Sequence, residues 1–114
     1  MKGRSIVTLD LEYGNPDVAS AISRMRNDLA TYRRLGYKAA VLIHGYGSTG
    51  IGGSIRAAVK NQLDEKSMRG IIKKHTGGED WLIKRGQFTS VCKALEKYER
   101  QISGNPGVTV AIFR

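Results

Sequence analysis

The sequence has few of the features that build covalent cross-links or membrane segments. Its single cysteine, Cys92, excludes an internal disulfide and a cysteine-rich metal site, and its helical context indicates a small core residue. Residues Met1 to Asp10 hold no apolar run long enough for a signal peptide or a membrane span. The chain also lacks internal repeats and low-complexity segments. We therefore expect a cytoplasmic protein.

Acidic residues are scarce relative to basic ones. Ten Asp and Glu stand against nineteen Lys and Arg, which gives a net charge of +9 and a pI near 10. Such a charge favours a polyanionic partner, because contacts to phosphates release counterions. An acidic membrane surface is the alternative, but no segment joins a basic face to a bulky apolar one as interfacial helices do. The composition therefore predicts nucleic acid as the partner and no membrane binding.

Glycine, in contrast, is concentrated in one place: five of the 14 glycines lie between Gly45 and Gly53. This stretch follows an apolar run that ends at His44, and it opens into a helical pattern over residues 54–63. Glycine lets the backbone adopt positive φ and approach a ligand closely, and a helix N-terminus attracts anions. The stretch predicts a phosphate-binding loop, with a loop that only needs tight turns as the alternative. The predicted contacts are Gly45, Tyr46, Gly47, Ser48, Thr49, Gly50 and Gly52.

The first half of the chain has a β-α-β-α pattern with short connections. Residues 5–11 are predicted as a strand, and the next helix has Asn15 as its N-cap, Pro16 at its first position and its end at Gly36. Residues 38–44 are the second strand, parallel to the first through a right-handed crossover. Ligands of open α/β sheets bind at the carboxyl ends of the strands. We therefore expect three candidate catalytic residues near the glycine loop: Asp10, Glu12 and His44.

The second half of the chain is less regular. Ile71-Ile72 and Trp81–Ile83 are predicted as two strands of a hairpin around Gly77-Gly78. The tryptophan of this hairpin is expected either to pack in the core or to stack on a base. A helix over 88–102 and a strand over 108–112 complete the 114-residue chain, which we expect to form one domain. The rim of the hairpin is basic: Lys73, Lys74, Lys84 and Arg85.

The glycine loop departs from two common nucleotide-binding motifs. It lacks the Gly-Lys-Ser/Thr ending of a P-loop, which argues against an NTPase. Gly45, Gly47 and Gly50 do match the G-x-G-x-x-G fingerprint of dinucleotide binding. The loop follows the second strand instead of the first, however, and no acidic residue ends a strand about 20 residues later. A small nucleotide-binding α/β protein is therefore kept as an alternative.

Three segments occur in an order that resembles one known family. They are Leu9-Asp10-Leu11 before a long helix, Val41–Gly47 with its His-Gly-Tyr-Gly ending, and the strand after Asn105. The order is similar to that of the Smr (small MutS-related) domain, which has an LDLH-type motif on its first strand and HGxG or TGxG after the next. The resemblance covers residues 5–63, and residues 64–104 look like an enlargement. It implies an α/β fold, a two-layer sandwich with a mixed four-stranded sheet, like the C-terminal domain of translation initiation factor three, plus an extra hairpin and helix before the last strand.

The same resemblance implies nucleic-acid binding. Several Smr domains nick DNA or cut RNA, and some are attached to mismatch-repair-like or ribosome-rescue proteins. Asp10 matches the motif acid, and His44, Gly45 and Gly47 match the glycine motif. The sequence departs from the pattern at Glu12, where the family motif has histidine. Two hypotheses stay open: a structure-selective endonuclease acting on DNA or RNA, and a module that recognises nucleic acid or a ribosome without cutting.

Cleavage of a phosphodiester requires a base and donors for the phosphoryl oxygens. His44 or Asp10 is the candidate base, and the loop amides, Arg56 and Lys60 are the candidate donors. Asp10 and Glu12 could share a divalent cation as cofactor, although two carboxylates alone do not establish a metal site. From the basic rim, two further phosphate contacts are expected: Lys73 and Lys74.

Overall fold

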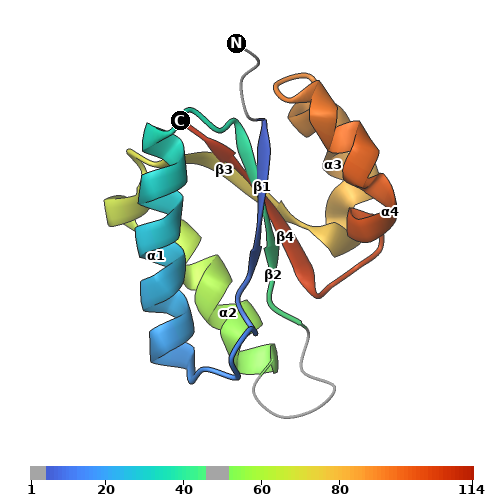
Figure 1. Cartoon of the computed structure of the whole chain (residues 1–114). Helices are drawn as coiled ribbons and strands as arrows, with labels where there is room; N and C mark the ends of the chain where they lie inside the picture. The colour runs from blue at the N-terminus through green and yellow to red at the C-terminus, as the bar shows by residue number, and fades with distance from the viewer. Residues whose placement is uncertain (1–4, 46–51) are drawn as a thin grey trace.

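Four strands form one mixed sheet in the computed structural model, which describes residues 5–45 and 52–114 (Figure 1). The strands are β1 (Ile6–Asp10), β2 (Ala39–Ile43), β3 (Ile72–Gly77) and β4 (Val108–Phe113). The α-helices are α1 (Val18–Arg34), α2 (Gly52–Leu63), α3 (Trp81–Thr89) and α4 (Glu99–Ile102). Three short 3-10 helices are η1 (Lys66–Met68), η2 (Gly78–Asp80) and η3 (Lys93–Tyr98). Within the described ranges, no helix is both long and apolar enough to cross a membrane.

The strand order is β1-β2-β4-β3. β1 and β2 are parallel, as the short β-α-β pattern predicts, and β4 runs antiparallel to both of its neighbours. The carboxyl ends of β1, β2 and β3 therefore lie at one edge of the sheet, together with the start of β4. The predicted mixed four-stranded sheet is confirmed.

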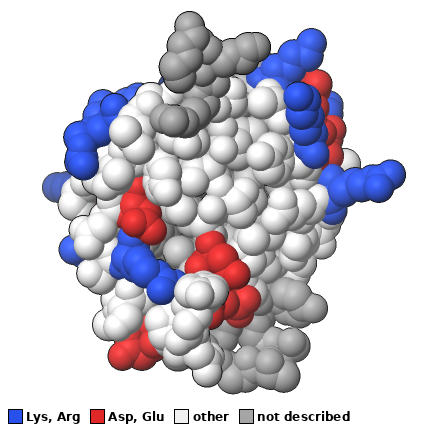
Figure 2. Space-filling model, in the orientation of Figure 1, with Lys and Arg blue, Asp and Glu red and all other residues white. Residues whose placement is uncertain are grey.

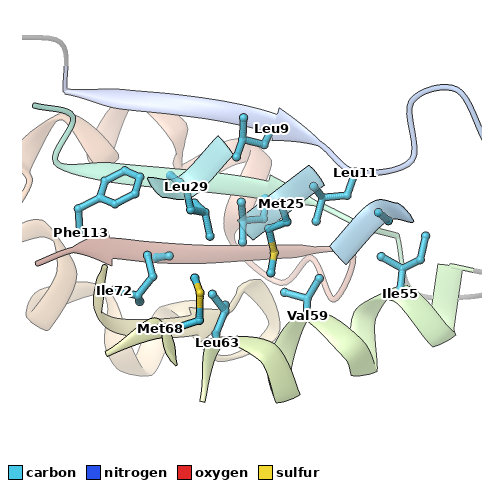
Figure 3. Close-up of a cluster of buried hydrophobic side chains, with 14 residues drawn as sticks. Leu9, Leu11, Met25, Leu29, Ile55, Val59, Leu63, Met68, Ile72 and Phe113 are labelled. Carbon is cyan, nitrogen blue, oxygen red and sulfur yellow. The ribbon is translucent and has the colours of Figure 1, made fainter. Parts of the chain in front are cut away.

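The face of the sheet toward α1 and α2 carries the larger core. Apolar residues three or four positions apart on α1 face this core, and Ala21, Met25 and Leu29 have no exposed surface. From α2, Ile55 and Val59 are equally buried. Full burial of such an aliphatic side chain contributes roughly 1.5–3 kcal/mol, so this layer supplies much of the folding free energy. Figure 3 shows this core, which also contains Leu9, Leu11, Leu63, Met68, Ile72 and Phe113.

The opposite face of the sheet is covered by the segment between β3 and β4 (Figure 1). Four of its side chains, Trp81, Phe88, Leu95 and Ile102, form a second core with residues of β2 and β4. This segment thus adds a helical layer to the expected sandwich of the sheet with α1 and α2. Because the sheet is covered on both faces, all six residues of β4 are buried, rather than only the alternate ones.

The helix α1 begins later than predicted. Asn15 is not the N-cap; it lies before the helix with a φ of 55°. The N-cap is Asp17, whose carboxylate accepts a hydrogen bond of 2.7 Å from the Ser20 amide. That bond lowers the pKa of Asp17, because it stabilises the charged carboxylate. Asp is as good an N-cap as Asn, so composition alone does not choose between the two positions.

The predicted hairpin around Gly77-Gly78 is wrong. Only its first strand, β3, forms, and Trp81 begins the helix α3. The indole of Trp81 is fully buried, which excludes base stacking, and its Nε1 donates to Glu99 at 2.9 Å. Arg85 donates to both Glu99 oxygens and, together with the indole, lowers the pKa of Glu99 to about 2. These contacts tie α3 to α4, so that the single helix predicted over 88–102 is replaced by the end of α3, η3 and α4.

Candidate functional site

The ends of three strands meet at one edge of the sheet. Backbone pairing places Asp10 beside Ile43, Ile43 beside Val108, and Gly77 beside Thr109. The residues that follow β1 and β2 therefore come together there, and Figure 1 shows α2 starting near the same edge. We call the surface at this edge the loop edge; its described residues are Glu12, Gly45, Arg56, Lys60 and Glu79.

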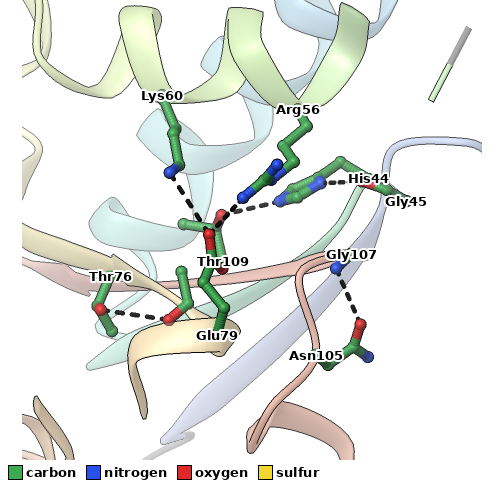
Figure 4. A network of polar contacts seen from close by, with 10 residues as sticks. His44, Gly45, Arg56, Lys60, Thr76, Glu79, Asn105, Gly107 and Thr109 are labelled. Atoms are coloured by element: carbon green, nitrogen blue, oxygen red, sulfur yellow. Dashed lines mark hydrogen bonds and ion pairs between the residues drawn. The ribbon is translucent and has the colours of Figure 1, made fainter. Parts of the chain in front are cut away.

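His44 lies beneath the loop edge and is fully buried. Its Nδ1 donates to the Gly45 carbonyl at 2.6 Å, which leaves Nε2 of the neutral ring to accept from the Thr109 hydroxyl at 2.8 Å (Figure 4). Burial lowers the pKa of His44, because the charged imidazolium is poorly solvated there. The amides of His44 and Gly45 both donate to the Gly107 carbonyl, at 2.9 and 3.0 Å. His44 therefore joins the end of β2 to the start of β4.

Asp10 and Glu12, at and just after the end of β1, are both exposed. The Glu12 amide donates to Asp10 Oδ1 at 3.0 Å, which closes a tight turn after β1. Gly45 has a φ of +73°, and a Cβ there would overlap the Glu12 carboxylate. The positive φ favours glycine at this position, whereas the exposed Glu12 side chain is free to move away from a Cβ. The Arg24 guanidinium braces the turn by donating to three carbonyl oxygens, those of Asp10, Leu11 and Tyr13.

Arg56 and Lys60 project from one face of α2, because residues four apart are neighbours on a helix. Both contact Glu79: the Arg56 guanidinium donates to Oε2, and Lys60 Nζ lies 3.6 Å from the same oxygen (Figure 4). Burial acts to raise the pKa of Glu79, but its own backbone amide, Arg56 and Lys60 outweigh that effect and the pKa is lowered. Glu79 is thus a carboxylate held in a cationic setting, and a Cβ on Gly77 would overlap it.

Glu79 is the residue that sequence reasoning missed. The sequence predicts a hairpin turn at Gly77-Gly78, and a turn gives no reason to expect a functional carboxylate directly after it. The structure instead continues from β3 into η2, and this brings Glu79 to α2. No local signal in the sequence links residue 79 to Arg56, since 23 positions separate them.

Lys73 and Lys74 lie near the start of β3, and the loop edge is at its other end. Lys74 Nζ donates to the Gln87 carbonyl at 2.8 Å and lies 5.2 Å from the centre of the Phe88 ring. The expected basic rim also includes Lys84 and Arg85. Arg85 is paired with Glu99. The structure therefore does not bring Lys73 and Lys74 together with Arg56 and Lys60.

Part of the predicted site lies outside the described residues, namely Tyr46, Gly47, Ser48, Thr49 and Gly50. Gly52 is the first residue of α2. Across residues 5–45 and 52–114, no group of three or more His, Cys, Asp or Glu is placed to hold a metal ion. Asp10 and Glu12 provide two carboxylates, so a divalent cation there would take its other ligands from water or from a bound phosphate.

The charge on one face of the molecule is uneven. Figure 2 shows an uncharged centre, with Lys and Arg side chains mainly at the left and right rims and acidic side chains both in the lower part and among the basic ones at the upper right. The net charge of +9 is therefore not spread uniformly over this face. Particular clusters, rather than the surface as a whole, are the places where a polyanion would bind.

The fold has a counterpart among solved structures. The Smr domain of Thermus thermophilus MutS2 superimposes with a TM-score of 0.55 at 22% sequence identity, over 96% of this chain and 98% of that one. No family model and no curated protein matches the sequence. The match spans nearly the whole of both chains, including the residues between α2 and β4. The chain therefore has the fold of an Smr domain.

Proposed function

We propose that this chain is a nucleic-acid-binding module that contacts its partner through the loop edge. The observation that carries the proposal is the convergence of Arg56 and Lys60 on one carboxylate oxygen of Glu79. Cations that converge on a carboxylate are also placed to bind a phosphodiester, whose oxygens accept the same charge-assisted hydrogen bonds. The net charge of +9 adds long-range attraction to a polyanion.

The resemblance to Smr domains supports the same class of partner. In this proposal His44 is a positioning residue: its bonds to Gly45 and Thr109 hold the backbone where the glycine loop leaves β2. A buried neutral ring with both nitrogens engaged is suited to that task. Binding to a structured RNA, a ribosome or a DNA duplex would use the same two cations, Arg56 and Lys60, because phosphate contacts do not depend on sequence.

Replacing both loop-edge cations, Arg56→Gln with Lys60→Gln, is expected to weaken binding by tenfold or more. Each cation that contacts a phosphate releases about one counterion, so the slope of log affinity against log salt should fall by about 2. The measurement is fluorescence anisotropy of a labelled RNA hairpin and a labelled DNA duplex at several salt concentrations.

A matched control is Lys93→Gln with Lys97→Gln, which removes the same charge from exposed positions of η3. This control should lose only the general attraction and keep the salt slope. Equal losses in the two double variants would contradict the proposal. So would a wild-type protein that binds a free nucleotide as tightly as either nucleic acid, since that result favours a nucleotide-binding protein.

Cleavage is the second candidate function, favoured by the exposed carboxylate of Asp10 beside Glu12 and Gly45. In this case Asp10→Ala should abolish nicking of supercoiled plasmid or cutting of structured RNA, while binding stays within a few-fold. A carboxylate that acts as base contributes typically 10²–10⁴-fold to the rate. Lanes with and without a divalent chelator test the metal. Cutting that survives Asp10→Ala would remove this residue from the reaction.

A further inference from the structure

A second basic surface lies at the other end of β3. It is a cleft of about 440 Å³, bounded by the end of α2, the start of β3 and the end of β4. We call it the β3 cleft, and the argument uses these residues of its lining: Asp64, Arg69, Lys73, Lys74, His75 and Arg114. The volume falls in the range of clefts that bind small ligands or ligand fragments.

The charge of the β3 cleft is positive. Its carboxylate, Asp64, is already paired with His75 at 2.8 Å. Lys74 is directed to Gln87 and the Phe88 ring, whereas Arg69 and Lys73 are exposed and form no ion pair within the described ranges. These two cations are therefore the ones placed to bind an anion that enters the cleft.

The walls of the cleft are held by hydrogen bonds to backbone oxygens. The Arg114 amide donates to the Ile71 carbonyl at 2.8 Å, and Arg114 Nε donates to the Arg69 carbonyl. Arg33, in the last turn of α1, donates to the Arg114 carbonyl at 3.2 Å. These bonds join three segments that are far apart in sequence. These bonds hold the backbone around Arg69 and Ile71 in place before an anion binds, which lowers the entropic cost of binding.

The β3 cleft is continuous with the loop edge along α2. Arg56, Lys60 and Asp64 follow one another at intervals of four residues, so they lie along one face of the helix. Across from them, Glu79 pairs with Arg56 and Lys60, and His75 pairs with Asp64. The eight steps from residue 56 to residue 64 rise about 12 Å along the helix, which corresponds to about 3.5 base pairs of a duplex at 3.4 Å each. Because Asp64 lines the cleft, this face of α2 runs from the loop edge to the cleft, and a duplex lying along it would meet both surfaces.

We propose that the β3 cleft binds a backbone phosphate of the same nucleic acid that contacts the loop edge. The inference rests on the proposed function, and it adds a second contact point a few base pairs from the first. A guanidinium and an ammonium that line the same concave surface suit a phosphodiester, because Arg offers a planar fork of donors and Lys a mobile point charge.

The test compares three double variants by fluorescence anisotropy with a labelled 20-base-pair duplex. Arg69→Gln with Lys73→Gln is expected to weaken binding about tenfold and to lower the salt slope by about 2. The Lys93→Gln, Lys97→Gln control should lose less and keep its slope. Both replaced side chains are exposed, so unfolding temperatures should match the wild type. Titration of the wild type should shift the backbone amide resonances of residues 72–74.

The outcomes separate this inference from the proposed function. If Arg56→Gln with Lys60→Gln weakens binding while the cleft variant behaves like the control, the β3 cleft is not a contact and the loop edge stands. If the wild type binds no nucleic acid, both proposals fail. If inorganic phosphate saturates the amide shifts of residues 72–74 without competing with the duplex, the cleft binds a separate small anion and the inference is overturned.

Discussion

Replacing Glu79 by glutamine is expected to tighten nucleic-acid binding by five- to tenfold at low salt. In the wild type, this carboxylate engages Arg56 and Lys60, the two cations that we assign to a phosphate. A phosphodiester must therefore displace Glu79 or share its partners with it. The amide keeps the size of the side chain but removes its charge, so the two cations become available. A five- to tenfold gain in affinity corresponds to about 1–1.4 kcal/mol, which exceeds the range of about 0.2–1 kcal/mol for one surface ion pair but suits a carboxylate that engages two cations.

The control for this experiment is Glu96→Gln, which makes the same change of net charge at an exposed position of η3. Anisotropy titrations of both variants should show a gain that is specific to residue 79. The difference should shrink as salt is raised, because screening weakens both the internal pair and the contact with phosphate. Weaker binding by Glu79→Gln would indicate that the carboxylate positions Arg56 and Lys60 for binding instead of competing with the phosphate.

Replacing His44 by alanine is expected to lower the free energy of unfolding by about 3–4 kcal/mol. The change leaves a cavity in a fully buried position and removes the partner of the Thr109 hydroxyl. An unsatisfied buried hydroxyl costs about 1–3 kcal/mol, and the cavity adds to that cost. Asp10→Ala, at an exposed position of the same edge, should cost less than about 1 kcal/mol. Urea unfolding at pH 7.5 measures both values.

The same histidine should make stability depend on pH. Its pKa is lowered in the folded protein, so below about pH 6.5 the unfolded chain binds more protons at this position than the folded one. Stability is therefore fully present above that pH and is lost as the pH falls toward the folded-state value. His44→Gln should remove this part of the acid sensitivity between pH 7.5 and 5.5. Two results would rule out the positioning role of His44. One is a His44→Gln protein whose stability has the same pH dependence as the wild type, and the other is a His44→Ala protein that loses no more stability than Asp10→Ala.

Several elements of the fold were predictable because their signals are local. The apolar stripe of α1 repeats every three or four residues, and the unbroken apolar run before His44 predicts a strand covered on both faces. The short connections then require a parallel pair. The hairpin prediction is wrong because the local signal is ambiguous there: a short apolar run such as Trp81–Ile83 is compatible with a strand or with a helix. In the structure Trp81 is buried, whereas Leu82 and Ile83 are 76% and 80% exposed, as expected on a helix that packs through one face.

The β-α-β-α order, the parallel strands, the position of the glycine loop and the excess of positive charge can all be predicted from the sequence alone. These depend on residue types and on spacings of a few positions, which act before any distant contact forms. The pairing of the charged and buried groups, in contrast, is visible only in the folded chain. His44 meets Thr109 across 65 positions, and Arg56 meets Glu79 across 23. Such pairs depend on how the segment between α2 and β4 crosses the sheet, and the energy of that packing comes from contacts that no local pattern encodes.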